Sequence, residues 1–325
     1  MSLLRLIAQR VILGLVAIWS LLTVVFGLFT MTPDWALSQR IAMAGFPHGL
    51  EPGEADRIRE GYLAARGLDR PLSEIYLDWM GNMITLQWGE SFRTREPVFP
   101  AVMAATRETA TYLVPAIVLA MIIGLGIGFI TAFYRDSLPA RALRSGTYFG
   151  LGLPHFWVGF VILVYVGIPP AFNSLETVIM PSEMPFLYGT VLPILLVTLA
   201  LSAAIVSYAR AYSLQYLSSD ITKLVRAKGG GRIAVSRHVL RNAAIPLVSL
   251  VFAETFALLA LSVFVLEALF GINGIGLLIY NTVWARDLPV LLGASMVVIS
   301  IGVLCNVLQD LAYSFLDPRV DTGTR

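Results

Sequence analysis

The chain has 325 residues, of which 57% are hydrophobic and only 14% are charged, and its formal net charge is +2. A soluble domain carries about 25% charged residues. One globular core could not cover so much apolar surface, so the composition excludes an ordinary soluble domain and favours an all-α protein that crosses a lipid bilayer several times. The single cysteine, Cys305, excludes an intrachain disulfide and a cysteine metal cluster.

Six stretches are apolar over the roughly 20 residues that a helix needs to cross a bilayer. They predict transmembrane helices at about Val11–Met31, Ala110–Phe133, Ser145–Ile168, Tyr188–Tyr208, Ala243–Leu266 and Val290–Tyr313. The first stretch is longer than the apolar part of a signal peptide, and no small-residue cleavage site follows it. We therefore interpret it as a helix that is retained in the protein.

The distribution of Lys and Arg predicts the orientation, because basic residues gather on the cytoplasmic side of a membrane. With a cytoplasmic N-terminus, the cytoplasmic segments hold Arg5, Arg10, Arg135, Arg141, Arg144, Arg210, Lys223, Arg226, Lys228, Arg232, Arg237, Arg241, Arg319 and Arg325. The two short outside loops together hold only Arg286. We expect a multi-pass protein of the plasma (inner) membrane with both termini in the cytoplasm.

The predicted helices divide the chain into four parts. Residues 1–31 form the N-terminus and the first span, and residues 32–107 form an extracytoplasmic insertion. Residues 108–317 form a core of five helices with a cytoplasmic loop at 209–242, and residues 318–325 form a cytoplasmic tail.

The insertion after the first span is too long for a simple connection. Glu54–Arg66 and Leu72–Ile84 have the apolar spacing of amphipathic helices, and Pro71 precedes the second as a start signal. The insertion is either a packed cap or part of a docking surface for a soluble partner, and both interpretations can hold together.

The cytoplasmic loop between the fourth and fifth spans has the most informative pattern. Asp220–Lys228 predicts a short helix that Ser218 or Ser219 can cap, and Gly229–Gly231 can end it with a sharp turn. A second helical stretch, Ile233–Arg241, leads back to the membrane. A short helix attached at both ends to spanning helices would act as a lever, whereas the simpler alternative is an ordinary basic loop.

Charged residues inside the spans are candidates for function because they are costly in lipid. Glu254 lies near the middle of the fifth span, where it could face a translocation path and meet a positively charged group there, or pack at a helix interface. Glu267 and Asp310 lie near helix ends that water reaches, which favours structural roles. The glycines at 124, 126 and 128 superficially match a dinucleotide-binding motif, but within an apolar span they indicate close helix packing.

Several short motifs, in this order, resemble the B-type permease subunit of the dipeptide/oligopeptide ABC importers. They are GLDRP (Gly67–Pro71), the WG-S-R-EPV pattern (Trp88–Val98), GLPHFWVG (Gly152–Gly159), RAKG (Arg226–Gly229), RHVLRNAAIP (Arg237–Pro246), EALFGINGIG (Glu267–Gly276), RDLPV (Arg286–Val290) and DLAYSFLDPRV (Asp310–Val320). The chain departs from this family in having three glycines after Lys228, where one is usual, and in the sequence Lys223-Leu224-Val225, where small residues are common.

The resemblance implies a type I ABC importer permease fold with six spanning helices. It implies that the chain forms half of the translocation path for di- or oligopeptides, with nickel, glutathione or oligosaccharides as alternative substrates. It also implies that coupling to the ATPase involves Asp220, Lys223, Arg226, Ala227, Lys228, Gly229, Gly230 and Gly231.

The implied partners are a second, homologous permease, two cytoplasmic ATP-binding subunits, an extracytoplasmic substrate-binding protein and the lipid bilayer, with no nucleic acid. ATP and Mg would bind to the ATPase subunits, and we expect no cofactor and no enzymatic activity in this chain. The only lysines, Lys223 and Lys228, follow Thr222 and Ala227, so the chain has no Gly-Lys phosphate loop.

Two other classes compete with this interpretation. A secondary transporter would need ionisable relays and inverted repeats within the spans, and Glu254 alone supports it. An intramembrane hydrolase would need a Ser/His pair or paired aspartates within the spans, and the sequence shows no convincing set.

Overall fold

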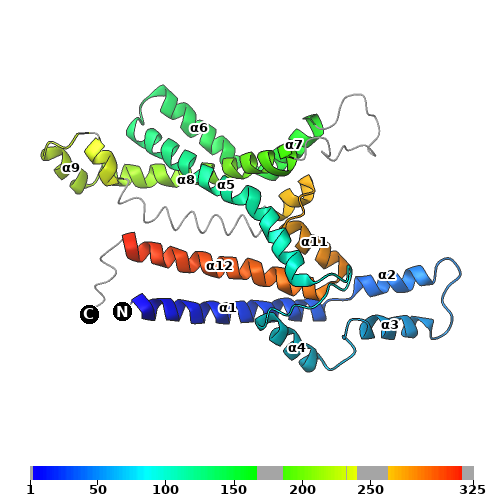
Figure 1. Cartoon of the computed structure of the whole chain (residues 1–325). Coiled ribbons are helices and arrows are strands. Elements are labelled where there is room, and N and C mark those ends of the chain that lie inside the picture. The colour runs from blue at the N-terminus through cyan, green and yellow to red at the C-terminus, as the bar shows by residue number, and fades with distance from the viewer. Residues whose placement is uncertain (1–2, 167–185, 232, 240–262, 317–325) are drawn as a thin grey trace. The chain divides into compact units, whose positions relative to one another are not determined.

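The computed structural model describes residues 3–166, 186–231, 233–239 and 263–316. The chain folds into two compact units. The core unit comprises Met1–Ala8, Glu108–Ile272 and Leu304–Arg325, and the insertion unit comprises Gln9–Arg107 and Asn273–Val303. Within the described ranges the regular elements are all helices, and the only β-pairing is one isolated bridge between Glu90 and Pro97 (Figure 1).

Four helical stretches of the described residues are long and apolar enough to cross a membrane, or up to six if each of two bent helix pairs counts as one span. The four contain α1 (Leu3–Met31), α5 (Val98–Phe133), α8 (Leu192–Leu217) and α12 (Leu288–Leu316). They coincide with the first, second, fourth and sixth predicted spans. Most of the fifth predicted span, Ala243–Leu266, lies outside the described residues.

The third predicted span is two helices rather than one. They are α6 (Leu138–Gly152) and α7 (His155–Val166). Leu153 between them is extended, with φ −99° and ψ 117°. The cause is Pro154, because the ring of a proline disfavours the helical conformation in the residue before it.

The core unit is held together by close contact between α5 and α8. A Cβ atom added to Gly124 would lie 2.7 Å from the side chain of Ile205, and one added to Gly128 would lie 2.5 Å from Cβ of Ala209. Gly126, between them, would meet no atom within 4 Å. Glycines four residues apart let two helices approach closely in lipid, so the packing interpretation of these glycines is confirmed.

A buried carboxylate connects α5 to the helix Val263–Phe270. Glu267 is 0% exposed, and its Oε1 accepts hydrogen bonds from the hydroxyls of Thr109 (2.5 Å) and Tyr112 (2.9 Å). The expectation that water reaches Glu267 is therefore wrong, because the α5 side chains cover it. The contacts agree with the structural role that we expected, whereas the side chain of Asp310 lies outside the described residues.

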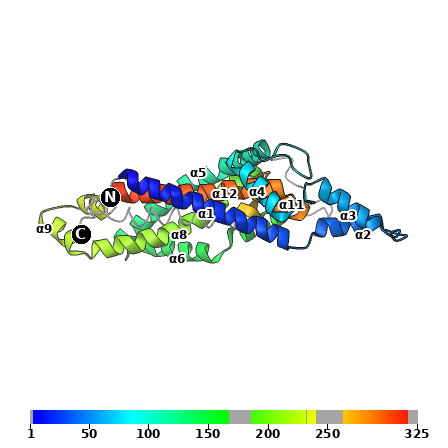
Figure 2. The same cartoon turned by 90° about the horizontal axis from the view of Figure 1, so that it is seen from below.

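The insertion unit joins most of two long helices, α1 and α12, to α11 (Ile275–Ala285) and to three short helices that follow α1. Figures 1 and 2 show α1 and α12 side by side, and a Cβ atom on Gly14 of α1 would clash with Val303 of α12. The short helices are α2 (Trp35–Ala44), α3 (Glu54–Ala64) and α4 (Leu72–Ile84). The two predicted amphipathic helices are thus confirmed as α3 and α4.

Helix α2 was not predicted from the sequence, although its start carries a recognisable signal. The side chain of Asp34 accepts a hydrogen bond of 3.0 Å from the backbone N–H of Leu37 and so caps the helix. An aspartate directly before an apolar stretch is a common helix start.

The insertion packs on the spanning helices through an apolar core. Its buried side chains are Leu22, Phe26, Phe29, Ile75, Met80, Met83, Trp88, Val98, Val102, Ile275, Leu288, Val290, Leu292 and Ala294. The hydroxyls of Thr23 on α1 and Tyr76 on α4 lie 2.8 Å apart and join the two helices. The insertion is therefore packed against these helices, as the packed-cap interpretation expects.

Two adjacent charged residues, Arg286 and Asp287, hold the ends of the insertion in place. Both lie between α11 (Ile275–Ala285) and α12, and they are 5% and 3% exposed. Arg286 donates hydrogen bonds to the carbonyl of Phe29 (2.8 Å) and the hydroxyl of Thr32 (2.7 Å), where the insertion begins.

Asp287 acts in the same way at the other end of the insertion. Its carboxylate accepts hydrogen bonds from the Ser91 hydroxyl (2.5 Å) and from the backbone N–H groups of Phe92 (3.1 Å) and Arg93 (3.2 Å). These residues lie shortly before α5 begins, so one short segment fixes both ends of the insertion.

We expect Asp287→Ala to destabilise the insertion unit by about 3 kcal/mol, because it removes the acceptor that the buried Ser91 hydroxyl shares with the part-buried N–H groups of Phe92 and Arg93. Thermal unfolding of the purified protein, together with limited proteolysis of the insertion, measures the effect. Glu96→Ala is the matched control, since Glu96 is exposed nearby. Equal stability of the two variants would refute this role of Asp287.

A second prediction concerns the contact between α5 and α8. Gly128→Leu should lower the free energy of unfolding by about 1–3 kcal/mol, because the new side chain would push into Ala209 and the backbone of α8. Gly126→Leu is the control, because the same change there meets open space. Thermal unfolding in detergent measures both, and a larger loss for the Gly126 variant would contradict the observed packing.

Candidate functional site: the α8–α9 segment

The helix predicted at Asp220–Lys228 is present as α9, Asp220–Ala227. Ser219 caps it, since its extended backbone (φ −68°, ψ 154°) directs its side-chain oxygen to the N–H of Thr222 at 3.4 Å. Asp220 in the first turn and Arg226 in the last turn both suit the helix dipole. The segment from residue 233 to residue 239 is also helical, as expected for the return toward the membrane.

Helix α9 is firmly attached to the end of α8. Thr222 is 0% exposed, and its hydroxyl donates a hydrogen bond of 2.6 Å to the carbonyl of Tyr216 in the last turn of α8. The hydroxyl of Ser219 donates to the same carbonyl at 2.7 Å. A displacement of α9 would therefore be transmitted directly to α8, and through Gly124 and Gly128 to α5.

The opposite side of α9 is an exposed stripe. Asp220, Lys223, Leu224 and Ala227 are all exposed and follow the spacing of one helix face. The ion pair between Lys223 Nζ and Asp220 Oδ1 is 2.7 Å long, but its water-exposed side chains give it little stabilising effect. The stripe is thus free to meet a partner.

Leu224 lies within the helix predicted from the sequence, but it is not among the residues singled out there for coupling. It is 54% exposed although it is apolar. The signal was present, because Leu224 lies four residues after Asp220 and beside Lys223 on the same face. It is the large apolar side chain of the stripe, so a partner that covered the stripe would gain burial of apolar surface there.

The three glycines after α9 have three different roles. Gly229 adopts a left-handed conformation with φ 81°, and its N–H bonds to the carbonyl of Arg226 at 3.0 Å. The N–H of Gly230 bonds to the carbonyl of Val225 at 2.9 Å, which completes a Schellman motif. A Cβ atom on Gly230 would lie 2.7 Å from that carbonyl oxygen, whereas one on Gly231 would meet nothing within 4 Å.

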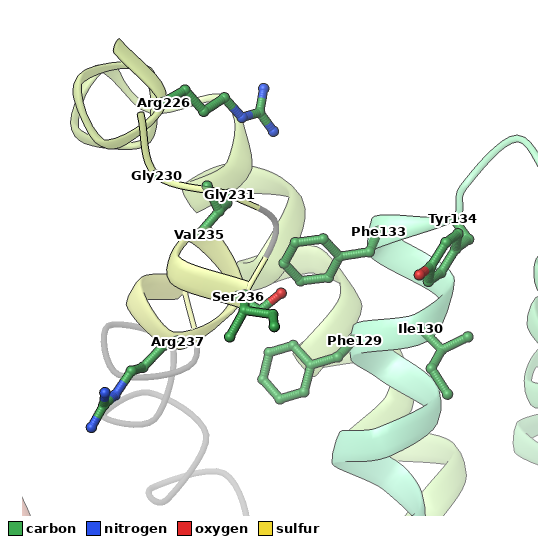
Figure 3. Close-up of a pocket in the computed structure, with 11 residues that line it drawn as sticks. Phe129, Ile130, Phe133, Tyr134, Arg226, Gly230, Gly231, Val235, Ser236 and Arg237 are labelled. Atoms are coloured by element: carbon green, nitrogen blue, oxygen red, sulfur yellow. The ribbon is translucent and has the colours of Figure 1, made fainter. Parts of the chain in front are cut away.

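A largely apolar groove of about 930 Å³ lies between the end of α5 and the segment that follows α9. Figure 3 shows Phe129 and Phe133 of α5 on one side of this groove and Val235 and Ser236 on the other. Arg226 also lines it, from the end of α9.

The predicted coupling residues therefore divide into three groups. Asp220, Lys223 and Ala227 lie on the exposed stripe. Arg226 borders the groove, while Lys228 and the three glycines form the turn. Glu254 lies outside the described residues, so the structure does not bear on its predicted place in a translocation path.

The exposed side chains of α9 and its C-cap are a mixture of charged and apolar groups. They are those of Asp220, Lys223, Leu224, Arg226, Ala227 and Lys228. In the described part of the chain, no group of three or more His, Cys, Asp or Glu side chains could hold a metal ion.

The shape of the turn predicts different effects of an alanine substitution at Gly230 and at Gly231. Gly230→Ala should loosen the end of α9, because its methyl group would clash with the Val225 carbonyl, whereas Gly231→Ala should have no effect. If the clash costs about 1.4 kcal/mol, the open form becomes about tenfold more populated and trypsin cleaves faster at Lys228. Time courses of cleavage of the purified variants measure this, and equal rates would contradict the turn as described.

Comparison with known proteins places this geometry in a family. Residues 124–322 match the family model described as binding-protein-dependent transport system inner membrane component. The chain is 31% identical, over 98% of its length and 99% of the relative's, to a putative peptide permease protein of Brucella ovis. It is 26% identical over 84% of its length and 88% of the relative's to the oligopeptide transport system permease protein AppB of Bacillus subtilis.

A further relative is named for another substrate. The metal-staphylopine import system permease protein CntB of Staphylococcus aureus is 27% identical over 80% of this chain and 81% of its own length. The matched family region includes α8, α9 and the glycine turn. The chain belongs to the family of binding-protein-dependent transport system inner membrane components, and it is a multi-pass permease subunit of the inner membrane.

Proposed function

We propose that this chain forms half of the translocation path of an ATP-driven importer of di- and oligopeptides, and that α9 is its coupling helix. The observation that carries the proposal is α9 itself. It is a capped helix with one face hydrogen-bonded to α8 and the other face exposed around Leu224. A coupling helix needs an exposed face that contacts the ATPase and a second face that is bonded to a spanning helix.

A chain that only transmits movement needs partner subunits that supply the energy, the second half of the path and the substrate. Two cytoplasmic subunits bind ATP and Mg and hydrolyse ATP, a second permease completes the path, and a soluble binding protein delivers the substrate from outside. The chain itself is not an enzyme, and ATP hydrolysis in the two ATPase subunits supplies the energy for transport. This arrangement places both termini, the start of α6 and α9 on the cytoplasmic side and the insertion outside, in agreement with the distribution of basic residues.

Coupling in this proposal is a sequence of contacts. Closure of the ATPases presses on the exposed stripe of α9. The bonds of Thr222 and Ser219 to the Tyr216 carbonyl pass the displacement to α8. The contacts at Gly124 and Gly128 pass it on to α5, so two spanning helices move as one body.

Peptides are the proposed cargo because the Brucella relative is named a peptide permease and covers almost the whole chain. A metal–chelator complex is the second candidate, because CntB is named for metal-staphylopine import. Uptake competition between labelled dipeptides and metal-chelator complexes distinguishes the two. Nickel, glutathione and oligosaccharides stay alternatives in the same assay.

The experiment that tests coupling uses the whole assembly in proteoliposomes with the ATPase subunits and the binding protein. Leu224→Asp should reduce ATP-driven uptake at least about tenfold, because a charge would replace the central apolar contact of the stripe. Leu138→Asp is the matched control, since Leu138 is 78% exposed at the start of α6, on the same proposed side.

The outcomes separate the competing classes. Normal uptake by the Leu224 variant would remove α9 from the coupling path. Uptake by this chain alone under a proton gradient, without ATP, would replace the importer by a secondary transporter.

A further inference from the structure

The insertion unit contains an open groove that the proposed coupling does not use. The groove has a volume of about 580 Å³ and lies between α2, α3, the segment before α5 and the end of α11. Its lining includes three arginines, Arg40, Arg66 and Arg93, and no carboxylate is among its described lining residues. The described residues offer none of these arginines an ion-pair partner.

Arg66 occupies the inner part of this groove in an unusual way. Its guanidinium lies 3.6 Å from the centre of the Tyr62 ring and 5.3 Å from that of Phe92. Its Nε atom is buried and has no hydrogen-bond partner among the described residues. Burial, with a further contribution from the charge of Arg40, lowers the pKa of Arg66. An anion in the groove would remove this electrostatic cost.

Two carboxylates, Asp34 and Asp287, act on the charge of Arg66, but both are already engaged, Asp287 by the bonds from Ser91, Phe92 and Arg93 described above. Asp34 accepts hydrogen bonds from the Tyr62 hydroxyl at 3.0 and 3.2 Å and from the N–H of Leu37 at 3.0 Å, and it lies 3.8 Å from Arg286. Burial raises the pKa of Tyr62 to about 12, so its ring is a neutral platform beneath Arg66 at physiological pH. The groove therefore keeps an excess of positive charge.

The rim of the groove has the composition of a protein-binding surface. Met43 and Trp284 are 66% and 62% exposed, and Arg40 and Arg93 are exposed beside them. Arginine, methionine and tryptophan are the residues that protein–protein contacts favour, whereas lysine and glutamate are depleted there. The groove thus suits a protein that carries carboxylates.

The position of the groove along the chain favours a soluble partner over a lipid headgroup. Ala8–Ala44 forms a nearly continuous helical stretch of 37 residues. At 1.5 Å per residue, the helix from Arg10 to Arg40 covers about 45 Å, which exceeds the roughly 30 Å of hydrocarbon in a bilayer. Arg40 and Met43 therefore lie beyond the lipid chains when Arg10 lies at the opposite surface.

From these observations we infer that the groove lined by Arg40, Arg66 and Arg93 is a docking site for carboxylate side chains on the surface of the soluble binding protein. This inference rests on the proposed importer function and on its orientation. Arg40 and Arg93 attract the acidic surface, and Arg66, held flat on Tyr62, receives one carboxylate. The groove thereby adds the docking role that the sequence left open for the insertion to its role as a packed cap.

The test measures binding of the purified cognate binding protein to the intact transporter assembly in nanodiscs at several salt concentrations. The double variant R40E/R93E should raise the Kd at least about tenfold, chiefly through a slower association rate, and should flatten the salt dependence. R57E/R59E is the matched control, because it makes the same charge change on exposed residues of α3 outside this groove. It should bind like the unaltered assembly.

A second measurement identifies the occupant directly. A photo-crosslinking residue at Met43 should capture the binding protein, whereas one at Ile84, which is 67% exposed at the end of α4, should not. Capture of the second permease or of a lipid at Met43 would overturn the inference, and so would unchanged affinity of R40E/R93E. If the unaltered assembly neither binds the binding protein nor imports substrate with ATP, the proposed function itself fails, which is a distinct result.

Discussion

The close approach of α5 and α8 is the contact on which the core unit depends. Lipid surrounds apolar side chains as well as a protein interior does, so helices in a bilayer associate through shape and short distance rather than through the hydrophobic effect. Gly124 and Gly128 provide that short distance, with backbone and side chains of α8 where their own Cβ atoms would be. Because α9 is bonded to the last turn of α8, the proposed use of α9 as a lever depends on this contact.

Buried charge is used differently in the two units, and in both cases its partners are specific. Glu267 joins two helices of the core unit through the hydroxyls of Thr109 and Tyr112. In the insertion unit, Arg286 and Asp287 bond to backbone groups at the two ends of a long segment. A charge buried with such partners stabilises one arrangement only, because moving any partner leaves an unpaired polar group. The insertion is therefore a fixed platform, suited to holding a binding surface.

Local pattern predicted most of the described helices, although not α2, and it did not predict the contacts between them. The periodicity of α3 and α4, the Ser219 cap and the glycine end of α9 were readable from neighbouring residues. The burial of Glu267 and the pairing of Asp287 with residues almost 200 positions earlier were not, because such contacts leave no periodic signal. The break between α6 and α7 could have been found at Pro154, but continuous hydrophobicity outweighed it. The role of the predicted coupling residues still rests on resemblance.

The glycine turn gives α9 two ends of unequal stiffness. Toward α8 the connection is short and doubly hydrogen-bonded, and on the other side a side chain would clash at Gly230 but would meet open space at Gly231, whose carbonyl accepts a hydrogen bond from the N–H of Val235. In the proposed coupling, a load applied to α9 would therefore deflect α8 first, and the segment after Gly231 would follow through a single backbone contact. The connection of α9 to α8 would thus be stiffer than its connection to the segment after Gly231. A permease built in this way can begin to move one side of its path before the other.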